Sequence, residues 1–408
     1  MVQSLSRRRL FAYKVIQGPR TKPVYNLDRM NKVNNGNGLE MAYLDEGHSD
    51  DVILLLHGFP ELAYSWRRVM PVLVQAGYRV IAPDQRGYGE TTGWPSGYEV
   101  DLAPYSFKNL VADALGLLNA LNIPSVAAVV GHDFGSPVAA WAAMTYPEIF
   151  RRLVLMSAPF GVPTINVFDA VARLQPPRVH YHQYYATPKA DRDMRHPPQG
   201  LRDFLRGYFH YKSGDHAANQ SHPLTAHELG TLPTYYIMEA GKTMPETVAT
   251  EMPEEPSKWL TDAELAIYSR EFERTGFQGG LNWYRARIKG VDSKERRTIP
   301  VPTTFIAGKH DWGVFQAPGV FESMQNTACS DMRGVHLVDG AGHWVQQEQA
   351  EITSRLLLNF LACSFHRNFL ITEGTYPSTQ PQDTAVELVP SPSGSATPWR
   401  RLPIASTA

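Results

Sequence analysis

The stretch from Val126 to Ala140 runs from a short apolar segment through a turn with glycine on both sides into a helix-like segment. Gly131 and Gly135 each lie two positions from Asp133, which is the spacing of a sharp strand-to-helix turn that exposes its strained central residue. A carboxylate there needs no activating base and forms an ester when it displaces a leaving group from a saturated carbon. The N-terminal dipole of the following helix would favour the ionised carboxylate. The alternative is an ordinary turn in which Asp133 caps the helix.

The composition is that of a globular protein, with 43% hydrophobic residues among 408 and a formal net charge of −1. This balance predicts small-molecule partners and no binding to nucleic acid or an anionic membrane surface. The two cysteines, Cys329 and Cys363, lack the spacing of a metal site and indicate a reducing compartment. No run of about 18 apolar residues occurs, so we expect a cytoplasmic protein without an integral membrane segment. We interpret Arg7–Arg9 as a solvated basic run, and the oligomeric state is not predicted.

Strand-like and helix-like segments alternate along the first part of the chain. Such alternation predicts a mostly parallel sheet with helices on both faces. A hairpin of Val24–Val33 and Leu39–Asp45, joined across Asn34–Gly38, precedes it. The predicted strands after the hairpin are Val52–Leu56, Tyr78–Ala82 and Arg152–Met156, and the predicted helices are Trp66–Gly77 and Phe107–Leu121.

A polar, aromatic and proline-rich region without an obvious strand interrupts this alternation. Near its end, Thr261-x-x-Glu264 predicts a capping box and a helix to about Arg274, after which Gly276 and Gly279-Gly280 break the helix. We therefore expect an irregular extension (1–23), a first core part (24–161), a helical cap (162–296), a second core part (297–363) and a disordered, Pro/Ser/Thr-rich tail (364–408). The second core part contains two predicted strands, Pro302–Ala307 and Gly334–Val338, and a helix, Glu348–Leu361.

The two strands after the cap each end at a residue that could complete a catalytic triad with Asp133. Asp311 follows the first strand and His343 follows the second. The carboxyl ends of parallel strands share one edge of the sheet, so we expect the three side chains to meet there. His57-Gly-Phe-Pro60 also follows a strand. We expect the backbone amides of Phe59 and Phe134 to form an oxyanion hole.

On these motifs the chain resembles an α/β-hydrolase of the epoxide hydrolase family, over residues 25 to 363. The motifs are His57-Gly-Phe-Pro-Glu61, Ser65-Trp-Arg67, Asp84-Gln-Arg-Gly-Tyr-Gly89, Gly131-His-Asp-Phe-Gly135 and Gly342-His-Trp-Val-Gln-Gln-Glu348. The resemblance implies the α/β-hydrolase fold with an inserted helical cap, and an enzyme that hydrolyses small-molecule epoxides without a metal or organic cofactor. The expected pocket residues are His57, Pro60, Trp66, Trp283 and Trp344.

Members of this family bind the epoxide oxygen with two cap tyrosines. The resemblance places one at Tyr284, in Asn282-Trp-Tyr-Arg285, and the other at Tyr181, for which Tyr184 and Tyr185 compete. It implies that Asp133 attacks a ring carbon and that water activated by His343 and Asp311 releases a vicinal diol. The substrate stays open, from xenobiotic and lipid epoxides to epoxides of a biosynthetic pathway.

Two other functions remain open. Haloalkane and haloacid dehalogenases of the same fold also use an aspartate, but those resembling this chain carry tryptophan or arginine after it, where this chain has Phe134. A non-catalytic ligand-binding protein is the second. A serine esterase is disfavoured because no Gly-x-Ser-x-Gly elbow occurs, and Ser136 falls in the first turn of the predicted helix. The cap region also contains several histidines, His180, His182, His196 and His210. They lack acidic or cysteine companions at metal-ligand spacing, so we do not expect a metal site there.

Overall fold

Continuous apolar runs form the centre of an eight-stranded sheet in the computed structural model, which describes residues 30–292 and 298–362. The strand order is β1-β2-β4-β3-β5-β6-β9-β10; neighbours pair in parallel from β4 to β10, while β1 and β2 add antiparallel at one edge. The strands are β1 Asn31–Asn34, β2 Glu40–Glu46, β3 Val52–Leu56, β4 Arg79–Pro83, β5 Ala128–His132, β6 Leu153–Met156, β9 Thr303–Gly308 and β10 Met332–Val338.

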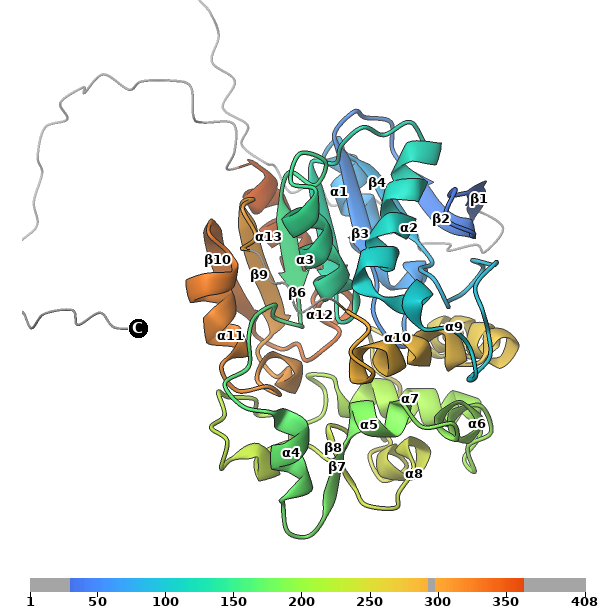
Figure 1. Ribbon diagram of the computed structural model, residues 1–408, viewed down its shortest axis with the longest axis vertical. Helices are drawn as coiled ribbons and strands as arrows, with labels where there is room; N and C mark the ends of the chain where they lie inside the picture. The colour runs from blue at the N-terminus through green and yellow to red at the C-terminus, as the bar shows by residue number, and fades with distance from the viewer. Residues whose placement is uncertain (1–29, 293–297, 363–408) are drawn as a thin grey trace, which may run out of the picture. The chain divides into compact units, whose positions relative to one another are not determined.

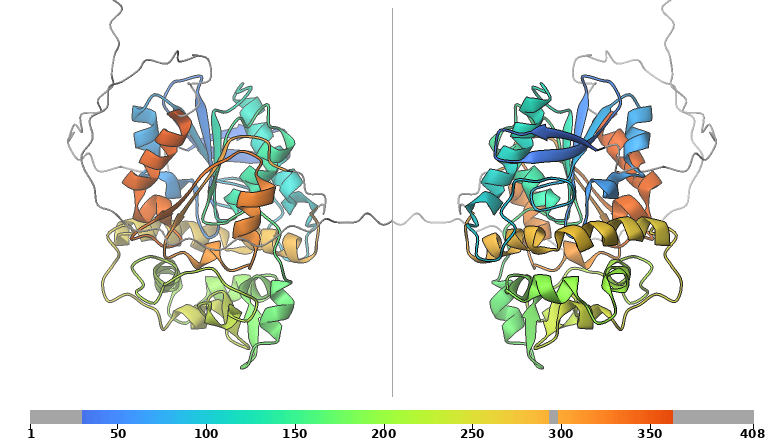
Figure 2. Two further views of the ribbon diagram at one scale, coloured as in Figure 1. Left: turned by 90° about the vertical axis from the view of Figure 1, so that its left-hand side faces the viewer. Right: turned by 90° about the vertical axis from the view of Figure 1, so that its right-hand side faces the viewer.

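Helices cover both faces of this sheet because both faces are apolar (Figures 1 and 2). Along β3, Leu54 and Leu56 belong to one hydrophobic cluster, whereas Ile53 and Leu55 belong to the other. The first face packs against α2 (Phe107–Ala120) and α3 (Gly135–Thr145), and the second against α1 (Met70–Gln75) and α13 (Ala350–Ala362). The short helices of the core are η2 Ala63–Trp66, η3 Ala103–Tyr105, η5 Trp312–Val314, α11 Val320–Ser323, η6 Met324–Ala328 and α12 Val345–Glu348. The predicted mostly parallel α/β sheet is confirmed.

Several predicted boundaries differ from the structure. The helix expected over Trp66–Gly77 is shorter in the structure: Trp66 is the last residue of η2, and α1 covers only Met70–Gln75. Pro71 lies in the first turn of α1, where its missing N–H costs no hydrogen bond. The strand expected over Val24–Val33 falls partly outside the described residues. Within the described part, β1 begins at Asn31. The N-terminal extension, Cys363 and the predicted tail also lie outside the described residues.

The chain between β6 and β9 forms a mainly helical layer at the carboxyl ends of the strands (Figure 1). We call the expected insertion, residues 162–296, the cap segment; its boundaries stay a prediction. Its helices are α4 Val167–Ala172, α5 Tyr181–Tyr185, α6 Ala190–Arg195, α7 Leu201–Tyr211, η4 Leu229–Thr231, α8 Met244–Val248, α9 Asp262–Thr275 and α10 Gln278–Ile288. The expectation that it holds no strand was wrong, because β7 (Arg178–His180) pairs antiparallel with β8 (Ile237–Glu239). Strands of three residues carry no readable alternation in the sequence.

Helix α9 has the predicted capping box, since the Thr261 side chain accepts from the Glu264 N–H and the Glu264 carboxylate accepts from the Thr261 N–H. The helix ends at Gly276, whose φ of 67° suits glycine. The expectation that Gly279 and Gly280 also break the helix was wrong, because both lie inside α10. A Cβ at Gly279 would collide with the Gly87 backbone, so these glycines allow α10 to approach the core closely.

Glu264 also joins α9 to the core through Arg67, at 2.9 Å between Arg67 Nε and Glu264 Oε1. Arg67 is buried and its other nitrogens donate to Gln347 and to the Trp259 carbonyl. Burial raises the pKa of Glu264, but Arg67 outweighs it and lowers this pKa from 4.5 to about 2. The contribution to stability is therefore complete above pH 4.5 and is lost as the pH falls toward 2.

We expect Glu264→Gln to lower the free energy of unfolding by about 2 kcal/mol at pH 7, because Arg67 loses its charged partner. Urea titrations of both proteins at pH 7, 5 and 3.5 measure this. The difference should shrink at pH 3.5 relative to pH 7. A difference that stays constant over these pH values would contradict the assigned ion pair.

Candidate active site

Asp133 occupies the sharp turn between β5 and α3, with a φ of 50°. This is a left-handed conformation that a residue with a side chain adopts only under strain. A Cβ at Gly131 would meet the Gly135 backbone, and a Cβ at Gly135 would meet the Leu56 carbonyl. A Cβ at Gly58 would collide with the Asp133 side chain itself. The small residues of the motif are thus explained by lack of space around the turn.

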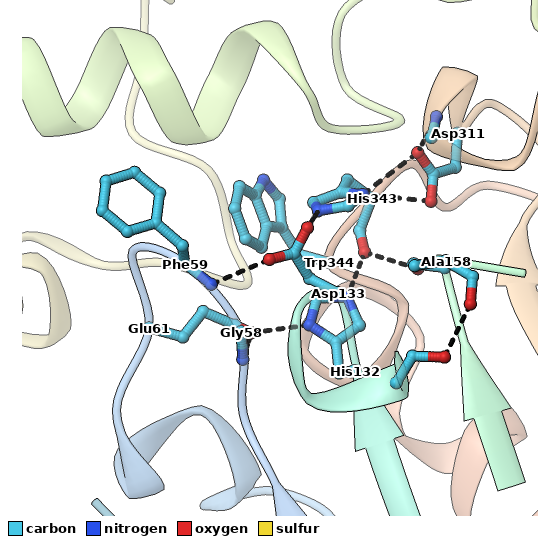
Figure 3. Close-up of polar contacts among 12 residues, drawn as sticks. Gly58, Phe59, Glu61, His132, Asp133, Ala158, Asp311, His343 and Trp344 are labelled. Atoms are coloured by element: carbon cyan, nitrogen blue, oxygen red, sulfur yellow. Dashed lines mark hydrogen bonds and ion pairs between the residues drawn. The ribbon is translucent and has the colours of Figure 1, made fainter. Parts of the chain in front are cut away.

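The structure brings the three predicted triad residues together from three strand ends (Figure 3). His343 Nε2 lies 3.1 Å from Asp133 Oδ2, and His343 Nδ1 lies 3.1 Å from both carboxylate oxygens of Asp311. The Gly313 N–H donates to Asp311 Oδ1 at 2.7 Å, which orients the acid. All three side chains are buried. This is the arrangement of nucleophile, base and orienting acid.

Opposing effects set the protonation of the triad. Burial raises the pKa of Asp133, but the hydrogen bond and charge of His343 and the charge of Lys212 hold this pKa below its ordinary value. Burial and Lys212 lower the pKa of His343, whereas Asp311 and Asp133 outweigh them and raise it. In the resting protein Asp133 is therefore an ionised carboxylate that accepts hydrogen bonds, as a nucleophile requires.

One predicted oxyanion donor already contacts the nucleophile, since the Phe59 N–H donates to Asp133 Oδ1 at 2.8 Å. Phe134 is the N-cap residue of α3, directly after Asp133, and its amide remains a predicted donor. His57, which we expected to bind substrate, holds the loop instead: its Nδ1 contacts the Gly58 carbonyl and its Nε2 accepts from the Gln85 N–H. Pro60 is buried next to Phe59 in the same loop.

The structure separates the four candidate tyrosines. Tyr181 and Tyr284 lie with ring centroids 6.0 Å apart, and burial followed by the charge of Asp133 raises the pKa of both phenols well above 10. The hydroxyl of Tyr184 donates to Asp193, and that of Tyr185 donates to Tyr208. These competitors have partners within the cap segment, which favours Tyr181 as the companion of Tyr284.

The three predicted pocket tryptophans occupy different places. Trp283 packs edge-on to Phe134 at 5.6 Å, and Trp344 packs edge-on to His343 at 4.7 Å. Trp66 belongs to the hydrophobic cluster on the second face of the sheet, with α1 and α13. The expectation that Trp66 binds substrate is therefore corrected: its motif neighbour Arg67 holds the cap segment, and Trp66 itself fills the core.

A buried polar network behind the triad was missed from the sequence. His132 Nδ1 contacts Glu61 Oε2 at 2.6 Å, and His132 Nε2 contacts the His343 carbonyl at 2.7 Å (Figure 3). Glu61 Oε1 accepts from the side chains of Gln346 and Gln347, both at 2.9 Å. These residues lie inside the quoted motifs, so the motifs were the available signal. The network fixes the loop of His343 relative to the turn of Asp133.

Glu348, in the same motif as His343, clamps that loop to the cap segment. Its Oε1 accepts from the Trp344 N–H, and its Oε2 accepts from the N–H groups of Gly342 and Gly214.

Within residues 30–292 and 298–362, no group of three or more His, Cys, Asp or Glu side chains is placed to hold a metal ion. Over the same ranges, no helix has the length and apolar character needed to cross a membrane.

Comparison with known proteins agrees with this geometry. Residues 51–350 match the family model described as the alpha/beta hydrolase fold. Epoxide hydrolase B of Mycobacterium tuberculosis (strain ATCC 25618 / H37Rv) is 35% identical over 340 residues, which cover 76% of this chain and 91% of that relative. Epoxide hydrolase A of the same strain is 34% identical, over 80% of this chain and 95% of the relative.

Solved structures give the same result. An epoxide hydrolase from an endophytic Streptomyces has a TM-score of 0.67 at 30% identity, covering 82% of this chain and 95% of the other. Potato (Solanum tuberosum) epoxide hydrolase I has a TM-score of 0.65 at 30% identity, covering 82% and 99%. The chain therefore belongs to the α/β-hydrolases. Within that class it is an enzyme of the epoxide hydrolase family, as its motifs predicted.

Proposed function

We propose that this protein converts an epoxide to a vicinal diol through an ester on Asp133. The observation that carries the proposal is the strained turn, which holds an ionised carboxylate between the Phe59 N–H and a histidine oriented by Asp311. The family relationship supports the choice of an epoxide, since the relatives are named as epoxide hydrolases. On its cysteine content we further propose that the protein acts in the cytoplasm.

In the first step a carboxylate oxygen of Asp133 attacks an epoxide carbon, and the C–O bond of the ring breaks. The oxygen keeps the bonding electron pair and takes a proton from Tyr181 or Tyr284. Because the pKa of both phenols is raised by burial and by Asp133, they are protonated at neutral pH and can serve as donors. The product of this step is a hydroxyalkyl ester.

In the second step water attacks the ester carbonyl carbon while His343 Nε2 takes its proton. Asp311 orients the imidazole and stabilises the imidazolium. The Phe59 N–H, with the Phe134 N–H, stabilises the oxyanion of the tetrahedral intermediate. Collapse of this intermediate breaks the bond to the diol oxygen, which takes the proton from His343. The second proton of the attacking water leaves the new carboxyl group of Asp133 and returns to the tyrosinate formed in the first step, so that Asp133 is again a carboxylate and the tyrosine is again protonated.

The test is to incubate the purified protein separately with an aryl epoxide and a primary haloalkane, and to identify the products by mass spectrometry. We expect a diol from the epoxide. In single turnover in H₂¹⁸O with protein in excess, the first diol should carry an oxygen from Asp133 and thus no label. Halide release without diol formation would assign a dehalogenase, and no reaction with either would favour a ligand-binding protein.

Tyr284→Phe should lower kcat/KM for the epoxide by about 10- to 100-fold, because one of two donors to the ring oxygen is lost. Tyr184→Phe is the matched control, since that hydroxyl contacts Asp193. Steady-state rates of both variants measure the effect. Equal rates for Tyr284→Phe and Tyr184→Phe would remove Tyr284 from the mechanism.

A further inference from the structure

Lys212 is a buried cation that no motif predicted. It is the C-cap residue of α7, is 2% exposed, and lies in the cap segment. Its ammonium lies over four aromatic rings: 5.3 Å from the centroid of Trp344, 5.4 Å from Tyr208, 5.5 Å from Tyr236 and 5.7 Å from Tyr235. Among the described residues no carboxylate lies within ion-pair distance of this nitrogen. Its charge is therefore held by ring faces rather than cancelled by a contacting anion.

The backbone of Lys212 fixes this charge relative to the catalytic histidine. The Lys212 carbonyl accepts from the His343 N–H at 2.8 Å. A Cβ at Gly342 would lie only 2.5 Å from the Lys212 carbonyl oxygen, so the two loops are in close contact. The Glu348 carboxylate joins them by accepting from both Gly214 and Gly342. The distance between Lys212 and His343 is thus set by several backbone contacts.

The carboxylates around His343 favour its protonated form, and the ammonium of Lys212 opposes it. Asp311 faces it from the loop after β9, and Asp133 from the turn after β5. His132 lies at 5.1 Å between ring centroids and connects Glu61 to the His343 carbonyl. Trp344, from the start of α12, is uncharged.

The aromatic rings that surround the Lys212 ammonium are neutral. Burial raises the pKa of Tyr208, Tyr235 and Tyr236 above 10, so these phenols carry no charge at neutral pH. Burial lowers the pKa of Lys212, and the charges of Asp133, Asp311 and Glu61 oppose that shift. The ammonium is therefore the positive charge that the cap segment places beside the three buried carboxylates of the site.

We propose that Lys212 is a positioning residue whose buried charge keeps His343 neutral while the ester is hydrolysed. This inference rests on the proposed two-step reaction. When Asp133 becomes an ester it loses its charge, but Asp311 still favours a protonated His343, which cannot accept the proton of water. The nearby ammonium disfavours a second positive charge and returns the histidine to its basic form.

The decisive measurement is the pKa of His343 itself, from NMR titration of protein with labelled histidine. The background is Asp133→Asn, whose neutral amide stands for the ester; intact mass verifies that the amide is retained. The His343 signal is assigned by its loss in His343→Gln. We expect Lys212→Met to raise this pKa by about one unit, which corresponds to a tenfold smaller neutral fraction below the pKa.

Two variants make the titration specific. Lys189→Met removes an exposed lysine that lies 5.8 Å from the ring centroid of Tyr184, and should leave the pKa of His343 unchanged. Lys212→Arg keeps the positive charge, so the pKa of His343 should stay near its value in the parent protein. Lys212→Gln replaces Lys212→Met if the latter does not fold. An unchanged pKa in a folded, neutral Lys212 variant overturns the proposal, whether or not the protein hydrolyses epoxides.

The pH dependence of ester hydrolysis tests the effect of the Lys212 charge in the enzyme that retains Asp133. We expect Lys212→Met to move the acid limb of diol release from a preformed ester up by about one pH unit, while ester formation at pH 7 stays within about threefold. A uniform loss at all pH values would indicate a structural role and overturn the proposal. Failure of the unmutated protein to form a diol refutes the proposed function instead, and leaves the titration to decide on Lys212.

Discussion

Asp133→Asn should reduce kcat for epoxide hydrolysis by about 10⁴-fold or more, because it removes the nucleophile without changing the volume of the side chain. An amide oxygen carries no charge and cannot form a stable ester with the ring carbon. The Phe59 N–H can still donate to the amide oxygen, so the turn should keep its conformation. Initial rates of diol formation measure the loss, with intact mass recorded on the same sample to verify that the amide remains.

The matched control for this variant is Asp50→Asn, an exposed carboxylate in the turn between β2 and β3. It makes the same chemical change far from the site and should keep the full rate. Thermal unfolding of both variants separates a catalytic effect from a folding defect. If the verified Asp133→Asn protein keeps more than about a tenth of the parent rate, Asp133 is not the nucleophile.

His343→Gln should stop the reaction at the ester, with kcat reduced by about 10³-fold or more while alkylation of Asp133 continues. Formation of the ester needs the carboxylate and the proton donors, whereas its hydrolysis needs a base that takes the proton of water. Glutamine cannot be that base. Intact mass after incubation with an aryl epoxide should increase by the whole mass of the epoxide, and peptide mapping should place the increase on Asp133.

The double variant Asp133→Asn/His343→Gln is the control, and should show no added mass. An adduct formed only from a primary haloalkane, and short by the halogen, would move the enzyme to the dehalogenases. An adduct on another residue would contradict the assigned nucleophile. If the epoxide is hydrolysed at the normal rate by His343→Gln, the base lies elsewhere and the role of Asp311 must be reassigned.

Local sequence patterns predicted the elements that depend on local physics. The apolar run Val52–Leu56 is β3 to the residue, and the capping box at Thr261 begins α9 as expected. The glycines around Asp133 predicted a strained turn, and the turn is there with a positive φ. In each case the signal lies within a few residues of chain: an apolar run, a side-chain cap, or glycines spaced around one residue.

Other features depend on residues that are distant in the sequence, and these were missed. The pairing of β7 with β8 joins short segments whose own patterns are too brief to predict a strand. Trp66 was expected to bind substrate, yet its ring packs in the hydrophobic cluster on the second face of the sheet. Lys212 follows an amphipathic helix, where a lysine is ordinarily solvent-exposed.

The amino-acid sequence by itself determined the alternation of strands and helices in the core, the turn that presents Asp133, and the positions of Asp311 and His343 at strand ends, because these follow from periodicity and backbone sterics. Only the tertiary structure decided which tyrosines lie near Asp133, which buried groups hold His343, and where Lys212 places its charge. Those properties depend on distance through space and on removal from water, and neither is encoded in the spacing of residues along the chain.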